Sequence, residues 1–509
     1  MNKLGLSIIS IALLASCSSS DQGELVGVQN RPEWFPTEPY GMVFVPSGSY
    51  NMGHQDPDVT NAWTAPTKTV SITAFYMDET EITNNEYRQF VHWVRDSIAR
   101  YRLAAKWDEM EFASVDERNE HPFGEYAFND PRYEDGQQLT AYQEYLQNIE
   151  GDNIGERDFQ DSVLQSLNWE PRLYWDPSNY PEEADAEGYV YVMESMYLPH
   201  HERFLGRNMI DARQLNYVYF WLDRAKAAQK AHDPFLSNRS TWDYQNEPEE
   251  LEYNEYYEKS WSYESFGVED RSSFFVKETI NIYPDTLVWV ADFSYSFNDP
   301  MHDMYFWHPA YDDYPVVGVN WKQASAFCNW RSKYRRSWLN SQEMMLEHEF
   351  RLPTEGEWEY ASRGGYEGTM YPWGGPYATT RLGCYTANFK PMRGNLTADG
   401  GFYPIKVATY DPNGYGLFDM GGNVSEWTSS AYAEESMYFL NNFNPDYRYR
   451  ADDSESETQK RKVIRGGSWK DIAFYMQNGT RDYEYQDTAK SFIGFRTVQN
   501  FLGRDPRDF

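Results

Sequence analysis

The clearest helical pattern follows a polar stretch near the start of the chain. Thr83 and Glu86 have the Thr-x-x-Glu spacing of a capping box, in which each side chain accepts a hydrogen bond from the other residue's backbone N–H at a helix start. Apolar residues then recur three and four positions apart, at Tyr87, Phe90, Val91 and Val94. We expect a helix over residues 85–108.

Two further helices are predicted in the second half of the chain. Asn320 can cap a helix whose one face carries Ala324, Phe327 and Cys328. Thr354 and Glu357 repeat the capping-box spacing just after a strand end at Arg351. We therefore expect helices to begin at these two places.

Short apolar runs bounded by turn residues predict strands at residues 42–46, 69–76 and 314–319. Beyond Gly364 the chain has many glycines and few helical runs. This part should be turn-rich, with short strands.

Residues 96–311 have a different composition, rich in Tyr, Asp, Glu, Asn and Pro. An apolar stripe predicts a helix over residues 207–231. The segment is too aromatic for a disordered linker and too polar for a core of its own. We interpret it as a large acidic, aromatic insertion packed on the rest of the domain.

The N-terminus has the features of an export signal. Lys3 precedes the apolar run from Leu4 to Leu14, which is too short to span a bilayer as a mature helix. The end of this run, Leu14-Ala15-Ser16-Cys17, resembles the cleavage box of bacterial lipoproteins, which implies lipid on Cys17. The alternative is an ordinary signal peptide with an unrelated cysteine.

Composition excludes two classes of protein. The net charge is −34, with a pI near 4.6, so phosphate-neutralising contacts with nucleic acid are not expected. Such a charge attracts cations or a basic partner protein. The three cysteines are too few, and odd in number, for a disulfide framework.

Seven sequence blocks occur in an order that resembles the formylglycine-generating enzyme, or sulfatase-modifying factor, family. They cover roughly residues 40–95 and 312–498 and read "FYMDETEITNNEY", "YPVVGVNWKQASAFCNW", "RLPTEGEWEYASRGG", "YPWGG", "NGYGLFDMGGNVSEWT", "VIRGGSW" and "IGFRTV". The resemblance implies an α+β, loop-rich fold with little regular secondary structure, related to C-type lectin folds.

The expected organisation combines the export signal, the family domain and the insertion. It comprises a signal peptide (1–16), a lipidated tether (17–36), the family domain (37–95 and 312–500), the insertion (96–311) and a C-terminal tail (501–509).

In the enzymes of this family, two cysteines five residues apart follow the Gly-Gly-Ser-aromatic turn, bind copper and activate oxygen. Aligned by that turn, the positions here are Asp471 and Met476, and neither supplies the thiolate that this chemistry needs. The resemblance thus predicts a non-catalytic protein without copper. Cys328 stands where the family often has a disulfide, but the usual partner position is Thr497.

The family also binds structural calcium through loop oxygens, and the matching positions can be read in this chain. They form a first set, Asn388, Phe389, Asp399 and Gly401, and a second set, Asp419, Gly422, Val424 and Glu426. Carboxylate, amide and carbonyl oxygens are the ligands that Ca²⁺ prefers. The alternative is that these residues only shape turns.

The lipoprotein box, the first blocks and the insertion together resemble one branch of the family more narrowly. That branch comprises the gliding-motility lipoproteins of the GldK (PorK) type, with the GldJ type as the close alternative. The resemblance implies a lipid-anchored outer-membrane protein that faces the periplasm. It also implies a structural ring subunit of the type IX secretion system that self-associates and binds a GldN/PorN-like partner.

Two other functions stay open from the sequence. One is an exported enzyme of the family with a changed active site. The other is a glycan- or peptide-binding lipoprotein, in which Trp358, Trp373 and Trp427 could stack on sugar rings.

Overall fold

The computed structural model describes a set of ranges separated by gaps. They are residues 37–54, 64–109, 125–126, 167–180, 188–203, 206–223, 227–228, 274–295, 299–342, 344 and 347–503. The predicted signal peptide, the lipidation site at Cys17 and the tether to residue 36 lie outside them. Residues Glu38–Phe501 cluster as one unit, which holds every element described below.

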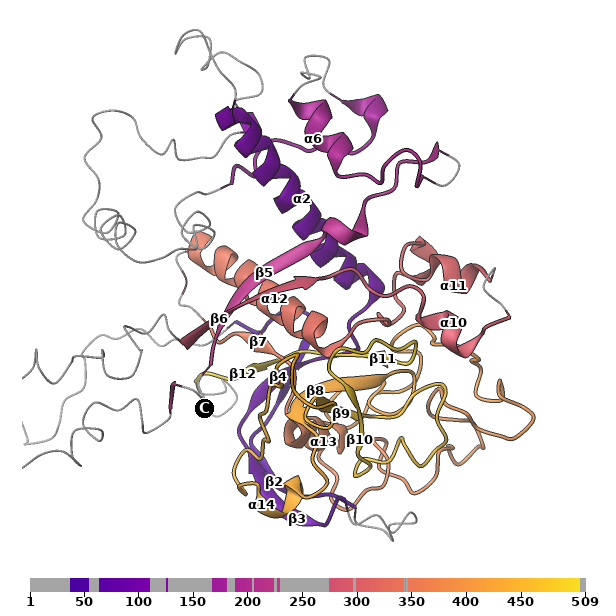
Figure 1. Cartoon of the computed structure of the whole chain (residues 1–509). Helices are drawn as coiled ribbons and strands as arrows, with labels where there is room; N and C mark the ends of the chain where they lie inside the picture. The colour runs from indigo at the N-terminus through magenta and orange to yellow at the C-terminus, as the bar shows by residue number, and fades with distance from the viewer. Residues whose placement is uncertain are drawn as a thin grey trace, which may run out of the picture. The chain divides into compact units, whose positions relative to one another are not determined.

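The helices of these ranges are two long ones and several short ones (Figure 1). The α-helices are α2 (Asn84–Glu109), α6 (Tyr189–Ser195), α10 (Val288–Asp292), α11 (Pro300–Met304), α12 (Trp321–Ser341), α13 (Glu355–Ser362) and α14 (Ser436–Phe439). The 3₁₀ turns are η2 (Pro177–Asn179), η4 (Ala212–Gln214) and η9 (Pro309–Tyr311). Among the described residues, no helix combines the length and apolar character that crossing a bilayer requires.

The strands form two four-stranded sheets and two hairpin-like pairs in the described part of the chain. They are β1 (Met42–Val45), β2 (Gly48–Met52), β3 (Lys68–Ile72), β4 (Phe75–Asp78), β5 (Asn216–Leu222), β6 (Phe275–Asn281), β7 (Phe350–Arg351), β8 (Ser425–Ala431), β9 (Arg461–Arg465), β10 (Asp482–Tyr485), β11 (Ile493–Gly494) and β12 (Val498–Asn500).

The first sheet joins segments from both ends of the chain. Its order is β1-β4-β12-β7 with antiparallel neighbours, and Met77 of β4 lies opposite both Val43 and Val498. All four residues of β4 are buried, as befits a central strand covered on both faces. The sheet therefore ties the N-terminal block to the last block of the domain.

The second sheet, β10-β9-β8-β11, carries the turn where the family has its catalytic cysteines. β8 pairs with β9 in antiparallel fashion and with β11 in parallel fashion, and a bulge separates Trp427 from Ala431. β9 ends at Arg465, directly before the double glycine. The direction of β9 thus sets where that turn begins.

The three predicted helix starts are confirmed. Thr83 N–H donates to Glu86 Oε2 at 2.8 Å, and Glu86 N–H donates to Thr83 Oγ1 at 3.3 Å. Asn320 and Thr354 form reciprocal capping boxes with the residues three positions on. The predicted face of Ala324, Phe327 and Cys328 is buried.

Three predictions of secondary structure were wrong. The described part of residues 207–231 does not form the predicted helix, because β5 occupies Asn216–Leu222, with Tyr217 and Tyr219 buried and Val218 exposed. The run 69–76 is two strands, β3 and β4, broken at Thr73 and Ala74. Residues 314–319 do not form a strand, because Gly318 has a φ of 77° and only Pro315 pairs, through a single bridge to Thr83.

Part of the predicted insertion shares a core with the family blocks. The helix α2 runs across the boundary predicted at residues 95 and 96. Tyr217 of β5 and Ile280 of β6 lie in the same buried cluster as Phe90 and Phe327, and the β5–β6 ribbon packs against α12 (Figure 1). In its described part, the segment 96–311 therefore adds to this core.

A buried ion pair fixes the two sheets to each other. Arg496, between β11 and β12, donates three hydrogen bonds to the Glu426 carboxylate of β8 at 2.6–2.9 Å, and both side chains are almost fully buried. Arg496 also donates to the carbonyl oxygens of Asp78 and Phe418. One guanidinium thus connects four segments.

We predict that Arg496→Met lowers the free energy of unfolding by about 3–5 kcal/mol, because it leaves the Glu426 carboxylate buried without its countercharge. Urea denaturation measures the change. The matched control is Arg336→Met, which removes the exposed pair with Glu349 and should cost about 0–1 kcal/mol. Equal effects of the two substitutions would contradict this ranking.

Candidate functional site

The Gly-Gly-Ser turn after β9 is built by two left-handed glycines. Gly466 and Gly467 have φ angles of 96° and 66°. A Cβ on Gly467 would lie 2.8 Å from the Tyr475 carbonyl carbon, and one on Gly466 would lie 3.1 Å from the Trp358 ring. Only glycine fits this close approach without displacing its neighbours, so the family's frame is kept.

Asp471, which the turn predicts at the position of the first family cysteine, contacts the turn itself. Its Oδ2 accepts a hydrogen bond from Ser468 Oγ at 2.5 Å, and its carbonyl accepts one from Lys390 N–H at 2.8 Å. Burial raises the pKa of the Asp471 carboxyl. These contacts explain the residue as a clamp between the turn and the loop at Lys390.

Met476 occupies the position of the second family cysteine and has no exposed surface. It packs in a cluster with Tyr371, Ala387 and Phe389. A thioether in this apolar setting fills space and offers no ionisable sulfur. A half-buried carboxylate and a buried thioether therefore stand at the two positions that the turn predicts for the family's thiols.

The two described cysteines are free and lie elsewhere. Cys328 is buried in the cluster around Tyr87 and Phe327, and burial raises the pKa of its thiol. Cys384 is exposed. At the position of the usual disulfide partner, Thr497 Oγ1 bonds Asp78 Oδ2 and Arg331 Nη1, each at 2.8 Å.

The first calcium set is brought together by direct contacts. Asp399 accepts hydrogen bonds from the N–H groups of Phe389 at 2.7 Å and Gly401 at 3.4 Å. A Cβ on Gly401 would lie 2.8 Å from Asn388 Oδ1. That Oδ1 is buried and has no hydrogen-bond partner in the described part of the chain, although Asn388 Nδ2 donates to Tyr403 O. An orphaned amide oxygen, one residue before the Phe389 N–H that binds the Asp399 carboxylate, fits a hard cation.

The second calcium set is arranged differently. The Glu426 carboxylate is already held by Arg496 and by Trp358 Nε1, which donates at 2.7 Å. Asp419 Oδ2 accepts from Ala408 N–H at 2.7 Å. A Cβ on Gly422 would lie 2.5 Å from the Asn388 carbonyl oxygen, and Val424 N–H points at Glu81. This set therefore fits a cation less well than the first.

No group of three or more His, Cys, Asp or Glu side chains is placed to hold a metal ion within the ranges that the structure describes. A cation at the first set would thus rely on one carboxylate together with amide and carbonyl oxygens.

Sequence reasoning missed Glu81 and Asn423, which connect the two sets. Glu81 is fully buried and accepts hydrogen bonds from Asn423 Nδ2 at 2.9 Å and from Val424 N–H at 3.1 Å. Asn423 N–H in turn donates to the Asn388 carbonyl at 2.8 Å. Burial raises the pKa of Glu81, and it raises the pKa of Asp419 to about 6. Asn423 has a positive φ, a conformation that Asn tolerates. The Asn that follows two glycines in "GGN" was therefore the available sequence signal for this residue.

The tryptophans considered for sugar stacking do not form a platform. Trp358 and Trp427 are buried, and their ring N–H groups donate to Glu426 and to the Val319 carbonyl. Trp373 stacks on Tyr371 with ring centres 5.0 Å apart. Two of the three rings therefore serve the core.

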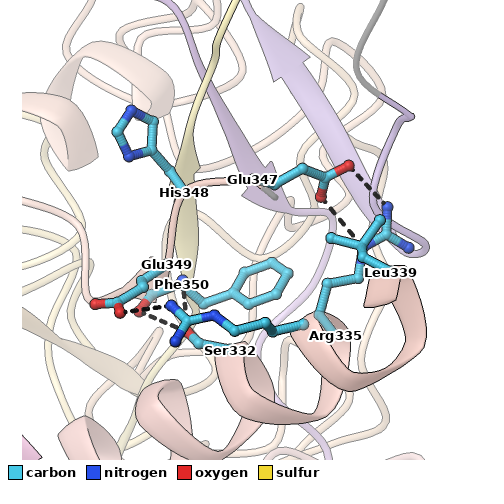
Figure 2. A pocket seen from close by; sticks show the side chains of 8 residues that line it. Ser332, Arg335, Leu339, Glu347, His348, Glu349 and Phe350 are labelled. Atoms are coloured by element: carbon cyan, nitrogen blue, oxygen red, sulfur yellow. Dashed lines mark hydrogen bonds and ion pairs between the residues drawn. The ribbon is translucent and has the colours of Figure 1, made fainter. Parts of the chain in front are cut away.

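Two small cavities lie near these elements. One, of about 20 Å³, is lined by Trp373, Asp411 and Asp419 among others. The other, of about 10 Å³, lies between the end of α12 and residues 347–350, where Glu347 and Glu349 pair with arginines of α12 (Figure 2). Each has room for about one water molecule, which is too little for an organic substrate.

Comparison with known proteins decides the family. A model of the sulfatase-modifying factor enzyme 1-like domain matches residues 29–137 and 205–501. The chain belongs to this family. The match extends into both sides of the segment 96–311, which was predicted as an insertion.

Similar proteins in this family include active and inactive members. The inactive C-alpha-formylglycine-generating enzyme 2 of Bos taurus is 34% identical over 200 residues, which cover 38% of this chain and 52% of that protein. The formylglycine-generating enzyme of Mus musculus is 31% identical over 196 residues, 37% of this chain and 45% of that protein. The chain thus spans about half the length of the curated relatives it matches. Family membership alone does not make a protein catalytic.

Among solved structures, PvdO from Pseudomonas aeruginosa aligns over 90% of this chain and 94% of its own, with 14% identity and a TM-score of 0.39.

Proposed function

We propose that this protein is a non-catalytic, lipid-anchored structural subunit of a secretion and gliding-motility machine in the outer membrane. The observation that carries the proposal is the pair Asp471 and Met476, a turn clamp and a buried thioether at the positions of the family's thiols. Neither of these two side chains is a thiolate, so the turn lacks the pair of thiols that the family's copper chemistry uses.

The narrower assignment is to the GldK (PorK) type, with the GldJ type as the alternative. It is supported by the lipoprotein box ending at Cys17 and by the first sequence blocks. In this role the protein faces the periplasm, self-associates in a ring and binds a GldN/PorN-like partner. A closed ring needs a head-to-tail interface between copies, and the net charge of −34 favours a basic partner.

A second candidate is an exported enzyme of the family with a changed site. It is favoured by the intact double-glycine frame and by the active relatives. The raised pKa of Asp471 would suit a proton donor, but the carboxylate is already engaged by Ser468. We therefore rank this candidate second.

We further propose that calcium binds at Asn388, Phe389, Asp399 and Gly401 and has a structural role. The support is the buried Asn388 Oδ1, which has no hydrogen-bond partner among the described residues, and the Asp399 carboxylate held by the next residue, Phe389. This loop region has few strands, so a cation that joins two loops would stabilise it.

The first prediction of the proposed function concerns catalysis. Purified chain, supplied with Cu(I), oxygen and a cysteine-containing peptide of the sulfatase type, should form no formylglycine by mass spectrometry. The formylglycine-generating enzyme of Streptomyces coelicolor serves as the positive control. Aldehyde formation above the peptide-only background would favour the second candidate.

The second prediction concerns assembly. Gentle detergent extraction of outer membranes and capture of a tagged copy should yield a very large particle with one abundant periplasmic partner. Cys17→Ala should release the chain from the membrane fraction, whereas Ser18→Ala should not. Recovery of the unmutated chain as a lone monomer at native abundance would sink the ring assignment.

The third prediction concerns calcium. Millimolar Ca²⁺ should raise the midpoint of thermal unfolding by a few degrees over the value in EGTA, because a ligand bound only to the folded state stabilises it. Asp399→Asn should remove the response, and Asp453→Asn, an exposed carboxylate elsewhere, should keep it. Identical midpoints in calcium and EGTA would refute the site.

A further inference from the structure

A groove of about 590 Å³ runs along α12, away from the Gly-Gly-Ser turn. Its wall includes residues of α12, the start of α2, Phe350 of β7, and Pro39 and Tyr40. Its volume lies within the range of pockets that bind organic ligands. It is far larger than either cavity described above, and none of the candidate site residues lines it.

Large aromatic rings line the groove and remain open to solvent. Tyr40 is 97% exposed, Tyr334 is 62% exposed and Trp338 is 45% exposed. Tyr334 stacks on the buried Trp330, with ring centres 5.7 Å apart, which holds it in place at the wall. Covering an aromatic surface of this kind with a ligand is favourable, because it removes apolar area from water.

One carboxylate in the groove keeps an open oxygen. Glu86 Oε2 accepts hydrogen bonds from Thr83 N–H at 2.8 Å and Thr83 Oγ1 at 2.9 Å. Its Oε1 accepts no hydrogen bond in the described part of the chain. The residue is exposed and lines the groove. The cap of α2 needs only Oε2, so capping does not account for Oε1.

The two arginines of the groove wall are already neutralised. Arg331 Nη1 donates to both carboxylate oxygens of Asp78, at 2.7 and 2.9 Å. Arg335 pairs with Glu347 at 3.2 Å, and Figure 2 shows that carboxylate with its arginine partner. With these pairs balanced, Glu86 supplies the net charge of the groove, which is negative.

We propose that this groove binds a lysine or arginine side chain presented by a partner protein. The ammonium or guanidinium donates to Glu86 Oε1 in a charge-assisted hydrogen bond, and the exposed ring of Tyr334 attracts the cation. The Trp338 ring, which already faces the Arg335 guanidinium at 4.8 Å, covers the aliphatic stem. The net charge of −34 steers such a partner toward the protein. The inference goes beyond the proposed function, since it holds for any partner that brings a basic side chain.

The test uses the full-length chain in detergent and two fluorescein-labelled hexapeptides, which differ only in a central lysine or acetyl-lysine. Anisotropy at low and physiological salt measures their affinities. We expect the lysine peptide to bind at least about tenfold more tightly than the acetyl-lysine peptide. Glu86→Gln should abolish this preference, because Gln keeps an oxygen for Thr83 but has no charge.

Control variants separate the groove from general attraction to an acidic surface. Glu367→Gln makes the same change at an exposed position outside the groove and should leave the preference intact. Trp338→Ala should weaken the binding of both peptides, and unfolding midpoints show that each variant is folded. Equal binding of the two peptides, or equal losses in Glu86→Gln and Glu367→Gln, would overturn the proposal. Retained preference in Glu86→Gln would also overturn it, because a group other than Glu86 would then recognise the cation.

Discussion

The structure depends on a short helix whose charged residues are all buried. Every residue of α13 is buried, and each of its three glutamates meets an arginine from another segment. Glu355 pairs with Arg481, Glu357 with Arg351, and Glu359 with both Arg363 and Arg465. Although burial raises the pKa of Glu359, the two guanidinium groups outweigh it and the pKa is lowered. Removal of Arg351, or of Arg363 and Arg465 together, would leave a buried carboxylate without its countercharge, so these segments hold together as a unit.

This constraint explains why the frame of the Gly-Gly-Ser turn does not depend on which residues follow it. Arg465, which pairs with Glu359, is the residue directly before Gly466 and Gly467. The helix α13 therefore fixes the start of the turn, and its Trp358 ring packs against Gly466. Such packing would be required whether two thiols or a carboxylate and a thioether followed the turn. A sequence can lose the reacting groups and still need every residue of the support, which fits a family that contains an inactive formylglycine-generating enzyme.

The parts of the fold that could be predicted are those governed by local chemistry. Capping boxes at Thr83, Asn320 and Thr354 depend on residues three positions apart, and all three were found from the sequence. The strand β5 was missed because an aromatic run such as "NYVYFWL" satisfies a helical stripe when its packing partner is unknown; Phe90, more than a hundred positions away, supplies that partner. The role of Glu81 could not be predicted either, since its partners Asn423 and Val424 lie over three hundred positions distant.

The same long-range logic links the core to the groove on α12. Where the family resemblance implies a disulfide between α12 and the last block, the chain has Thr497 within a network of Asp78 and Arg331. The network connects the same two segments by charge. It also engages the Arg331 guanidinium, which would otherwise face Glu86 across the groove as a free cation. With Arg331 held by Asp78, Glu86 is the carboxylate of this groove that has no salt bridge in the described part of the chain.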